Sequence, residues 1–240
     1  MKRLTSISAA LAVALAASIM MVGTASAATC TPTGFVRDGI DMTAAQIGGD
    51  VTGTLDATGC NIGVYYDSPS GDVTSAEIFG ANYFGVVVNG ASVDVTGSSV
   101  HNIGEVPFNG AQHGNAIVYL DDVAGGGTTS GTISGTTVSS YQKNGITVRD
   151  AGTSVSVMNN TVTGEGPVNY IAQNGIQISF GASATVRGNT VSGNSYTPDD
   201  TIACGLLLFK ADGVKTGMNR LFANEVNFCN FGRGGGNSKP

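Results

Sequence analysis

Two segments of the chain repeat one phrase, and they carry the side chains best suited to chemistry. Residues 104–114 read GEVPFNGAQHG, and residues 164–175 read GEGPVNYIAQNG. The positions that they share are Glu105 with Glu165, Asn109 with Asn169, and Gln112 with Gln173. Carboxylates can act as general acid and base on a glycosidic bond, and amides hydrogen-bond to polar ligand groups. The phrase therefore predicts an edge that binds or cleaves a sugar chain.

Glu105, Glu165 and His113 are the candidates for a catalytic role. The two segments lie two repeats apart, which would place their carboxylates about 9–10 Å apart, near the upper end of the range for inverting glycoside hydrolases. The interpretation that the residues favour first is scaffolding, in which the copied residues stabilise the same turn and the carboxylates cap backbone N–H groups. A lone His is more often a hydrogen-bonded loop residue than a general base. The residues therefore favour binding over catalysis, and they form no clear catalytic constellation.

A third segment is expected to leave the repeat at the same edge one coil later. Residues 192–204 read SGNSYTPDDTIAC and contribute Tyr196 and Asp199. No cofactor is predicted, and calcium bound by the carboxylates is the alternative. The predicted ligand-binding set is Glu105, Asn109, Gln112, His113, Glu165, Asn169, Gln173, Tyr196 and Asp199.

A repeat that runs through the chain must position these loops. Six glycines head short apolar segments at spacings of 22 to 31 residues: Gly63, Gly85, Gly114, Gly145, Gly175 and Gly205. A second phrase follows each segment and includes a small residue that we expect to stack in one column: Ala81, Ser98, Thr136, Asn160, Asn189 and Asn224. Recurrence at this period is typical of a solenoid. We predict an all-β parallel β-helix of about six to seven coils over residues 61–231.

Alternation along the predicted strands separates inward from outward positions. Ile146 and Val148 should point inward, with Thr147 between them pointing outward, and the coils headed by Gly175 and Gly205 follow the same pattern. An extra residue, Asn115, interrupts the alternation after Gly114, so the register of that coil stays open.

The ends of the chain differ from the repeat. Residues 28–60 are expected to form an N-terminal cap, in which residues 42–47 (MTAAQI) make one helical turn after Asp41 as N-cap. The segment 51–55 (VTGTL) is then expected to be the first strand. The Gly-rich tail over residues 232–240 is predicted to be disordered.

The first residues and the cysteines both indicate export. Residues 1–27 combine Lys2 and Arg3, an apolar stretch and the small-residue sequence ASA, which predicts a secretory signal peptide cleaved near Ala27. No later segment is predicted to span a membrane. All four cysteines follow the leader, and spacings close to one coil favour pairing Cys30 with Cys60 and Cys204 with Cys229. Four cysteines allow three connectivities, so the other two stay open.

The charge of the chain limits its partners. The formal net charge is −6, and residues 28–122 hold 11 acidic residues against the single base Arg37. This balance argues against nucleic acid and against anionic membranes as partners. It also weighs against a polyanionic sugar unless calcium bridges the charges.

The phrases NGIQISFGASATVRGNTV and GNTVSGN within residues 144–194 resemble the right-handed parallel β-helix repeats of the pectate-lyase-like superfamily, including NosD-like secreted proteins. The resemblance covers about residues 61–230 and implies a right-handed solenoid. Members of the superfamily include polysaccharide lyases, hydrolases and adhesins, so function stays open. Of the polygalacturonase-like motifs, this sequence contains only Asp121-Asp122 and, as a partial match, His113-Gly114. Lyases of the superfamily use a basic residue, and Lys143 and Arg149 lie near one strand with few acids around them.

We therefore expect a secreted β-helix protein that recognises extracellular polysaccharide or another surface partner without clear catalytic residues. A polysaccharide lyase or glycoside hydrolase with its site on the loop edge is the first alternative. A structural envelope or matrix protein is the second. The residues leave the oligomeric state open.

Overall fold

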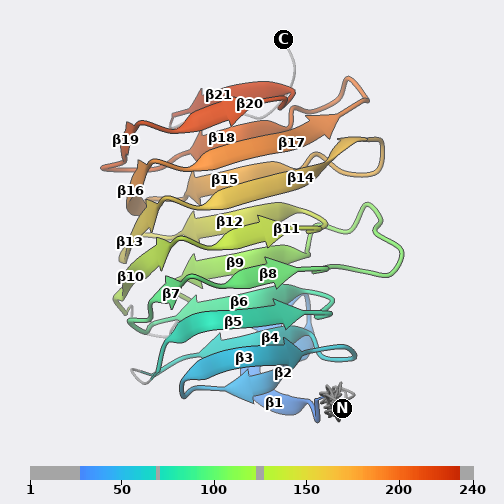
Figure 1. The fold of residues 1–240 in the computed structure, drawn as a ribbon, viewed down its shortest axis with the longest axis vertical. Coiled ribbons are helices and arrows are strands. Elements are labelled where there is room, and N and C mark those ends of the chain that lie inside the picture. Colours follow the sequence, from blue (N-terminus) through green and yellow to red (C-terminus); the bar gives the residue numbers. More distant parts are fainter. Residues whose placement is uncertain (1–27, 69–70, 123–126, 233–240) are drawn as a thin grey trace, which may run out of the picture.

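The computed structural model describes residues 28–68, 71–122 and 127–232, and every helix or strand assigned in these ranges is a β-strand. The strands wind into a stack of coils with the N-terminal strands at one end and the C-terminal strands at the other (Figure 1). The leader predicted over residues 1–27 and the tail from residue 233 onward lie outside the described residues. Over the described ranges, no helix is long and apolar enough to cross a membrane.

The strands form two sheets. Sheet A has nine strands in the order β1-β2-β4-β6-β9-β12-β15-β18-β21. Their bounds are β1 Thr31–Arg37, β2 Ile40–Ile47, β4 Ile62–Tyr66, β6 Phe84–Asn89, β9 Asn115–Leu120, β12 Asn144–Arg149, β15 Asn174–Ser179, β18 Cys204–Phe209 and β21 Val226–Phe231. Sheet B has twelve strands. Their bounds are β3 Val51–Asp56, β5 Val73–Phe79, β7 Val95–Thr96, β8 Ser99–His101, β10 Thr129–Ser134, β11 Thr137–Ser139, β13 Thr153–Met158, β14 Thr161–Val168, β16 Ser183–Arg187, β17 Thr190–Tyr196, β19 Lys215–Gly217 and β20 Arg220–Phe222.

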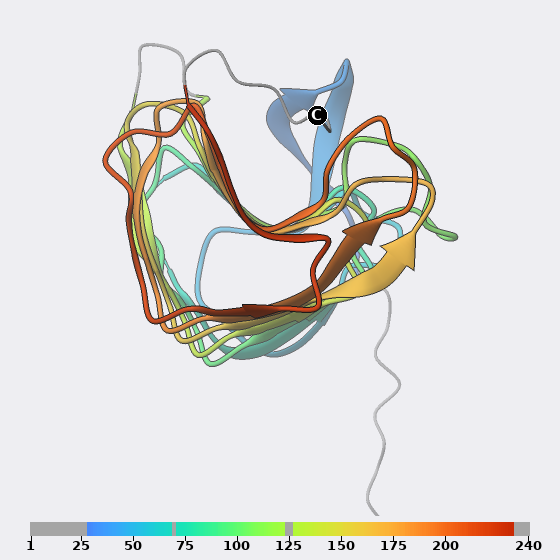
Figure 2. The same ribbon diagram turned by 90° about the horizontal axis from the view of Figure 1, so that it is seen from above.

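Sheet B covers two sides of the coil, because the long strand β5 pairs with both short strands of the next coil, β7 and β8. Sheet A is the third side, and the coils superimpose when seen along their axis (Figure 2). Apart from the antiparallel hairpin β1–β2, all strand pairs of the two sheets are parallel. The architecture is therefore the predicted parallel β-helix.

Equivalent side chains stack in columns through the core. Ile117, Ile146, Ile176 and Leu206 are register partners on successive strands of sheet A, and all four are buried. Asn115 is aligned with Asn144 by the same register, so Ala116 takes the place of Gly145. The expectation that Gly114 heads this strand is therefore wrong, because Gly114 precedes β9. The predicted inward positions are confirmed, and Thr147, predicted to point outward, is also buried.

The predicted polar column is correct in its middle and wrong at its ends. Side-chain to backbone hydrogen bonds link four of the predicted members one above another: Ser98, Thr136, Asn160 and Asn189. The next member is Asn219, whose Oδ1 accepts the N–H of Asn189, and the first coil contributes Ala76, whose N–H donates to Ser98 Oγ. Ala81 and Asn224 lie instead at the second bend of the coil, where Asn224 Oδ1 accepts the N–H of Asn194. Each coil has two bends of similar sequence, and the spacing did not distinguish them.

The N-terminal cap contains strands instead of the predicted helical turn. Residues 42–47 belong to β2, which pairs antiparallel with β1 and parallel with β4, so sheet hydrogen bonds satisfy its backbone. Met42 and Ala44 alternate into the core, which is the two-residue period of a strand. Residues 51–55 do form a strand, but it is the third strand of the chain, β3.

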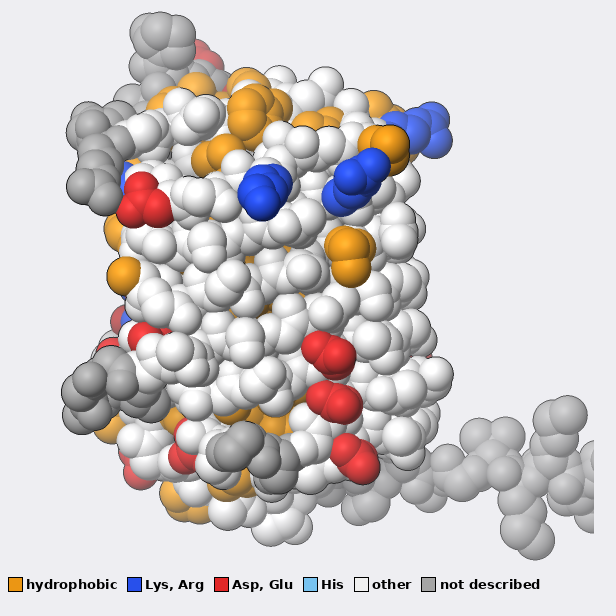
Figure 3. All heavy atoms as spheres, turned by 90° about the vertical axis from the view of Figure 1, so that its left-hand side faces the viewer, with side chains coloured by type: hydrophobic (Ala, Val, Ile, Leu, Met, Phe, Trp, Pro, Cys, Tyr) orange, Lys and Arg blue, Asp and Glu red, His pale blue; other side chains and the backbone are white. Residues whose placement is uncertain are grey.

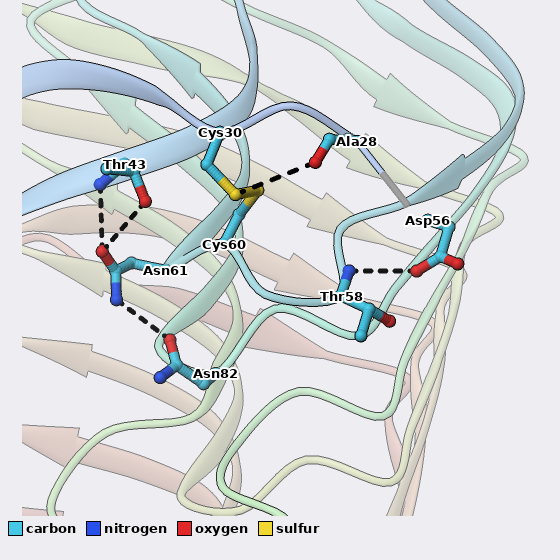
Figure 4. Close-up of a disulfide and its surroundings, with 8 residues drawn as sticks. All are labelled: Ala28, Cys30, Thr43, Asp56, Thr58, Cys60, Asn61 and Asn82. Atoms are coloured by element: carbon cyan, nitrogen blue, oxygen red, sulfur yellow. Dashed lines mark hydrogen bonds between the residues drawn. A yellow bond between two sulfur atoms is a disulfide. The ribbon is translucent and has the colours of Figure 1, made fainter. Parts of the chain in front are cut away.

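Both predicted disulfides are confirmed. Cys30–Cys60 has a Cα–Cα distance of 5.3 Å and Cys204–Cys229 one of 6.1 Å, and they join neighbouring layers near opposite ends of the stack. Beside the first bridge, the side chain of Asn61 accepts from Thr43 and donates to Asn82 (Figure 4). Two disulfides indicate an oxidising, extracellular environment.

Candidate ligand-binding groove

The outer face of sheet A is hollowed between the hairpin β1–β2 and the loops that enter the sheet. The groove is a cavity of about 170 Å³. Phe35, Arg37 and Asp38 of the hairpin line it on one side, and residues of β9, β12 and β15 form its floor. In the view along the coil axis, the hairpin stands away from the stack on the side where the loops project (Figure 2).

Three loops project from one edge, as predicted. They connect β8 to β9, β14 to β15 and β17 to β18, and Figure 1 shows them one above another on the right-hand side. The first two touch, because a Cβ placed on Gly110 would lie 3.0 Å from the carbonyl oxygen of Tyr170.

His113 lines the groove, is buried, and is held by contacts on several sides. Its ring stacks on Tyr83 with 3.7 Å between centroids and an interplanar angle of 8°. Its Nδ1 lies 3.0 Å from the carbonyl oxygen of Asn82, which can only accept, so Nδ1 carries the proton. Its Nε2 lies 3.4 Å from Glu105 Oε1. Glu105 and His113 therefore form a pair that would be an ion pair with the imidazole protonated.

Two glutamines anchor the repeated phrase. Gln142 Oε1 accepts the N–H of Glu105 at 3.0 Å, and Gln173 Oε1 accepts the N–H of Glu165 at 2.9 Å. Both glutamines are fully buried. The predicted counterpart of Gln173 was Gln112, but Gln112 is exposed and its amide donates to Gly110. The repetition of Gly-Glu thus reflects a shared anchor, which was one of the predicted alternatives for these loops, although a glutamine makes the cap instead of the glutamate.

Gln142 was missed by the sequence analysis. It donates from Nε2 to the carbonyl oxygens of Ala111 and His113, and it holds the whole first loop from the coil above. Its signal in the sequence was its place just before a repeat strand, two residues ahead of Asn144.

The other predicted ligand residues lie on the projecting loops. Asn109 Oδ1 accepts the N–H of Ala111, and Asn169 is exposed. Tyr196 is the register partner of Val168 at the end of β17, and Asp199 is exposed in the third loop. Among the residues that line the groove, only His113 and Gln112 come from the predicted set. Glu105 lines a separate apolar hollow with Val106 and Phe108.

Basic side chains surround the groove. Lys143 immediately precedes β12 and Arg149 is its last residue, and both line the cavity together with Arg37 of the hairpin. Lys143 Nζ donates to the carbonyl oxygen of Ala172 at 2.9 Å, and burial lowers the pKa of this ammonium to about 8. Arg149 forms an ion pair with Asp150, with Nε 3.1 Å from Oδ2. One carboxylate, Asp38, lines the same cavity.

The floor of the groove is a network of amides with one unused acceptor. Asn144 Nδ2 donates to Thr147 Oγ1 and to Gln177 Oε1, and Asn144 Oδ1 accepts from Asn174. Oδ1 of Asn115, one coil below Asn144, is buried without a hydrogen-bond partner. Because this oxygen is enclosed by protein, it belongs to the packing beneath the groove and not to the open surface.

Metal ligands do not gather anywhere in the described part of the chain: no three His, Cys, Asp or Glu side chains form a group that could hold an ion.

Comparisons with protein-family models, with curated proteins and with solved structures found no match to this chain. The groove is therefore interpreted from its own geometry.

Proposed function

We propose that this is an exported protein that binds an acidic polysaccharide in the groove on sheet A. The observation that carries the proposal is the ring of Arg37, Lys143 and Arg149 around a polar floor. The predicted signal peptide and the two disulfides support an extracellular place of action.

The local charge of the groove differs from that of the whole chain. The net charge of −6 weighed against a polyanionic ligand. However, acidic residues of the N-terminal half such as Asp50, Asp72 and Asp94 lie at the start of strands in sheet B or just before them, away from the groove. The side chains that line the groove include three cations and one carboxylate, and Asp150 pairs with one of these cations, Arg149. Arginine and lysine bind carboxylates through charge-assisted hydrogen bonds.

The floor suits a sugar as well as a carboxylate. Asn115, Asn144 and Gln177 line the cavity, so their amide groups can hydrogen-bond to sugar hydroxyls. His113, whose ring stacks on Tyr83, lines the same cavity. Polar groups held in this way orient a ligand, while the cations supply most of the attraction.

The proposal predicts selective binding of carboxylated chains. Isothermal titration with oligogalacturonate, and with an uncharged dextran of the same length, tests it directly. Lys143→Met and Arg149→Met should each weaken oligogalacturonate binding by about tenfold, since each removes one charge-assisted contact. Lys210→Met is the matched control, because Lys210 is exposed and does not line the groove. Equal affinity for dextran and oligogalacturonate would contradict the proposal.

A polysaccharide lyase is the second candidate, and the pKa of Lys143 favours it. An amine with a pKa of about 8 is partly neutral near pH 7–8 and can take a proton next to a uronate carboxyl group. The electron pair of the broken C–H bond then forms the carbon–carbon double bond, and the glycosidic oxygen leaves with the electron pair of its C–O bond and takes a proton from solvent water. Unsaturated ends accumulating from polygalacturonate, and lost in Lys143→Met, would support this activity. Binding without such products would assign the groove to recognition alone, and neither binding nor products would favour a structural envelope role.

We also propose that the chain is related to the pectate-lyase-like superfamily, whose repeats its own repeats resemble. This relationship is supported by the parallel β-helix with its loops on one edge.

A further inference from the structure

The two ends of the solenoid are complementary to each other. At the N-terminal end, β3 pairs with no strand but β5 within the described residues, and Ala28 N–H donates to the carbonyl oxygen of its last residue, Asp56. The rest of its outer edge has no strand partner among these residues. At the C-terminal end, β19 and β20 pair only with β16 and β17, and β21 pairs only with β18. Among the described residues no helix covers either end. Open strand edges are templates for pairing with another chain.

Apolar side chains are exposed at the C-terminal end. Met218 is 77% exposed, Phe228 45% and Phe222 39%. Met218 and Phe228 border a hollow with Leu221, which is only partly buried. At the other end, Leu55 of β3 is likewise partly buried against the core, and Ile47 of β2 is 42% exposed. Each end therefore displays an unfinished layer of the core.

The same columns run from one end to the other. The core column that begins at Val51 passes through Val73, Val95, Ile133, Val157 and Val186 and ends at Thr216. The column that begins at Leu55 ends at Leu221 by the same kind of register. A second copy placed on the C-terminal end would continue both columns with its β3. The pairing of β5 with β7 and β8 is an internal precedent for one long strand lying on two short ones.

The two ends of the solenoid also carry opposite charges along one outer column of side chains. Asp50, Asp72 and Asp94 form an outer ladder in which Oδ1 of one aspartate accepts the N–H of the next. By register, this outer column continues through Thr132 and ends at Lys215. Figure 3 shows acidic residues gathered toward the N-terminal end of this face and basic residues toward the C-terminal end.

We propose that the protein assembles head to tail, with β3 of one copy pairing on β19 and β20 of another. Lys215 then lies one coil, about 4.8 Å, from Asp50 of the next copy. Arg220 lies opposite Thr54 and beside Asp56 of that copy, which adds a second attraction. A head-to-tail contact is heterologous, so successive copies form an open filament and not a closed dimer. The groove on sheet A stays accessible along such a filament, and assembly does not depend on what the groove binds.

Sedimentation velocity of the protein recovered after export, over a range of concentration and salt, tests this assembly. We expect the sedimentation coefficients to increase with protein concentration, as larger assemblies form, and to decrease when salt is added. Asp50→Lys and Lys215→Asp should each weaken self-association by about tenfold, because each places like charges across the contact. An equimolar mixture of the two variants should restore assembly, since each supplies the end that the other lacks.

Asp94→Lys is the matched control. It makes the same charge change and removes an equivalent ladder hydrogen bond, to Thr132 N–H, but two coils from the contact. Assembly close to that of the unmodified protein is expected for this variant. A monomer at every concentration in low salt would overturn the proposal. So would two other results: self-association that Lys215→Asp and Asp50→Lys leave unchanged, or a mixture of the two variants that fails to assemble. Those last two results would mean that the protein self-associates through another surface, or that the ends of the solenoid bind a different partner.

Discussion

The segments 104–114 and 164–175 share one phrase but use their glutamates differently, and Glu105 lies in the loop between β8 and β9 whereas Glu165 lies in strand β14. In the first, the anchoring amide is Gln142 from the next coil, and Glu105 meets His113 Nε2. In the second, the anchor is Gln173 from the same segment, and the Glu165 side chain is exposed. The repeated Gly-Glu backbone is therefore the part of each segment that a buried glutamine anchors. His113 and Lys143 line the candidate groove, and neither is a repeated position of the phrase.

The largest effect should come from breaking the anchor of the second loop. Gln173 accepts from the N–H of Glu165 and donates to the carbonyl oxygens of Tyr141 and Gln142. Gln173→Met would leave these buried backbone groups unpaired and should lower the free energy of unfolding by about 2–4 kcal/mol in urea titrations. Gln112→Met, at the position that the phrase suggests is equivalent, should change it by less than about 0.5 kcal/mol. Equal effects would show that the two glutamines share one role after all.

A smaller effect should come from Lys143, which lies between the two loops. Its pKa is about 8 in the folded protein, against an ordinary value of 10.5. Between these pH values the unfolded chain binds more protons, so the free energy of unfolding rises as the pH increases. Relative to Lys143→Met, the unmodified protein should gain about 1–2 kcal/mol from pH 8 to pH 10.5, less than the full shift because the side chain is only half-buried. Parallel stability curves for the two proteins would contradict the burial of this ammonium.

The smallest effect should distinguish the two glutamates themselves. Glu105→Gln removes the carboxylate beside His113 and should strengthen binding of oligogalacturonate by about twofold, because one repulsive charge near the groove is lost. Glu165→Gln should leave the affinity unchanged, since its side chain does not line the groove. Titration calorimetry at low ionic strength measures both. An effect of Glu165→Gln as large as that of Glu105→Gln would place both carboxylates at one site.

Much of the fold could be predicted from particular residues. The glycine-headed strands, the alternation of Ile146 and Val148, the loops on one edge and both cystines follow from a period close to thirty residues. The helical turn over residues 42–47 was wrong because a short window of helix-compatible residues was outweighed by pairing on both sides of β2. Of the candidate site, the loops were predicted, but the anchor Gln142 and the neighbourhood of Arg37 were not. The contacts of Gln142 join it to residues 29 to 37 positions away, and Arg37 lies more than 100 positions from Lys143 and Arg149.

The sequence by itself determined that short strands recur, that they stack in parallel, and which face of each strand is apolar, because these properties depend on residue type and local period. Only the tertiary structure decided which bend of one coil lies over which bend of the next. A solenoid presents similar residues at every bend, so shifting an end phrase such as LFANEV from one bend to the other leaves its local pattern acceptable. Hydrogen bonds across coils, such as those of Asn219 and Asn224, select the register. The same stacking brings Arg37 of the hairpin to the groove that Lys143 and Arg149 line.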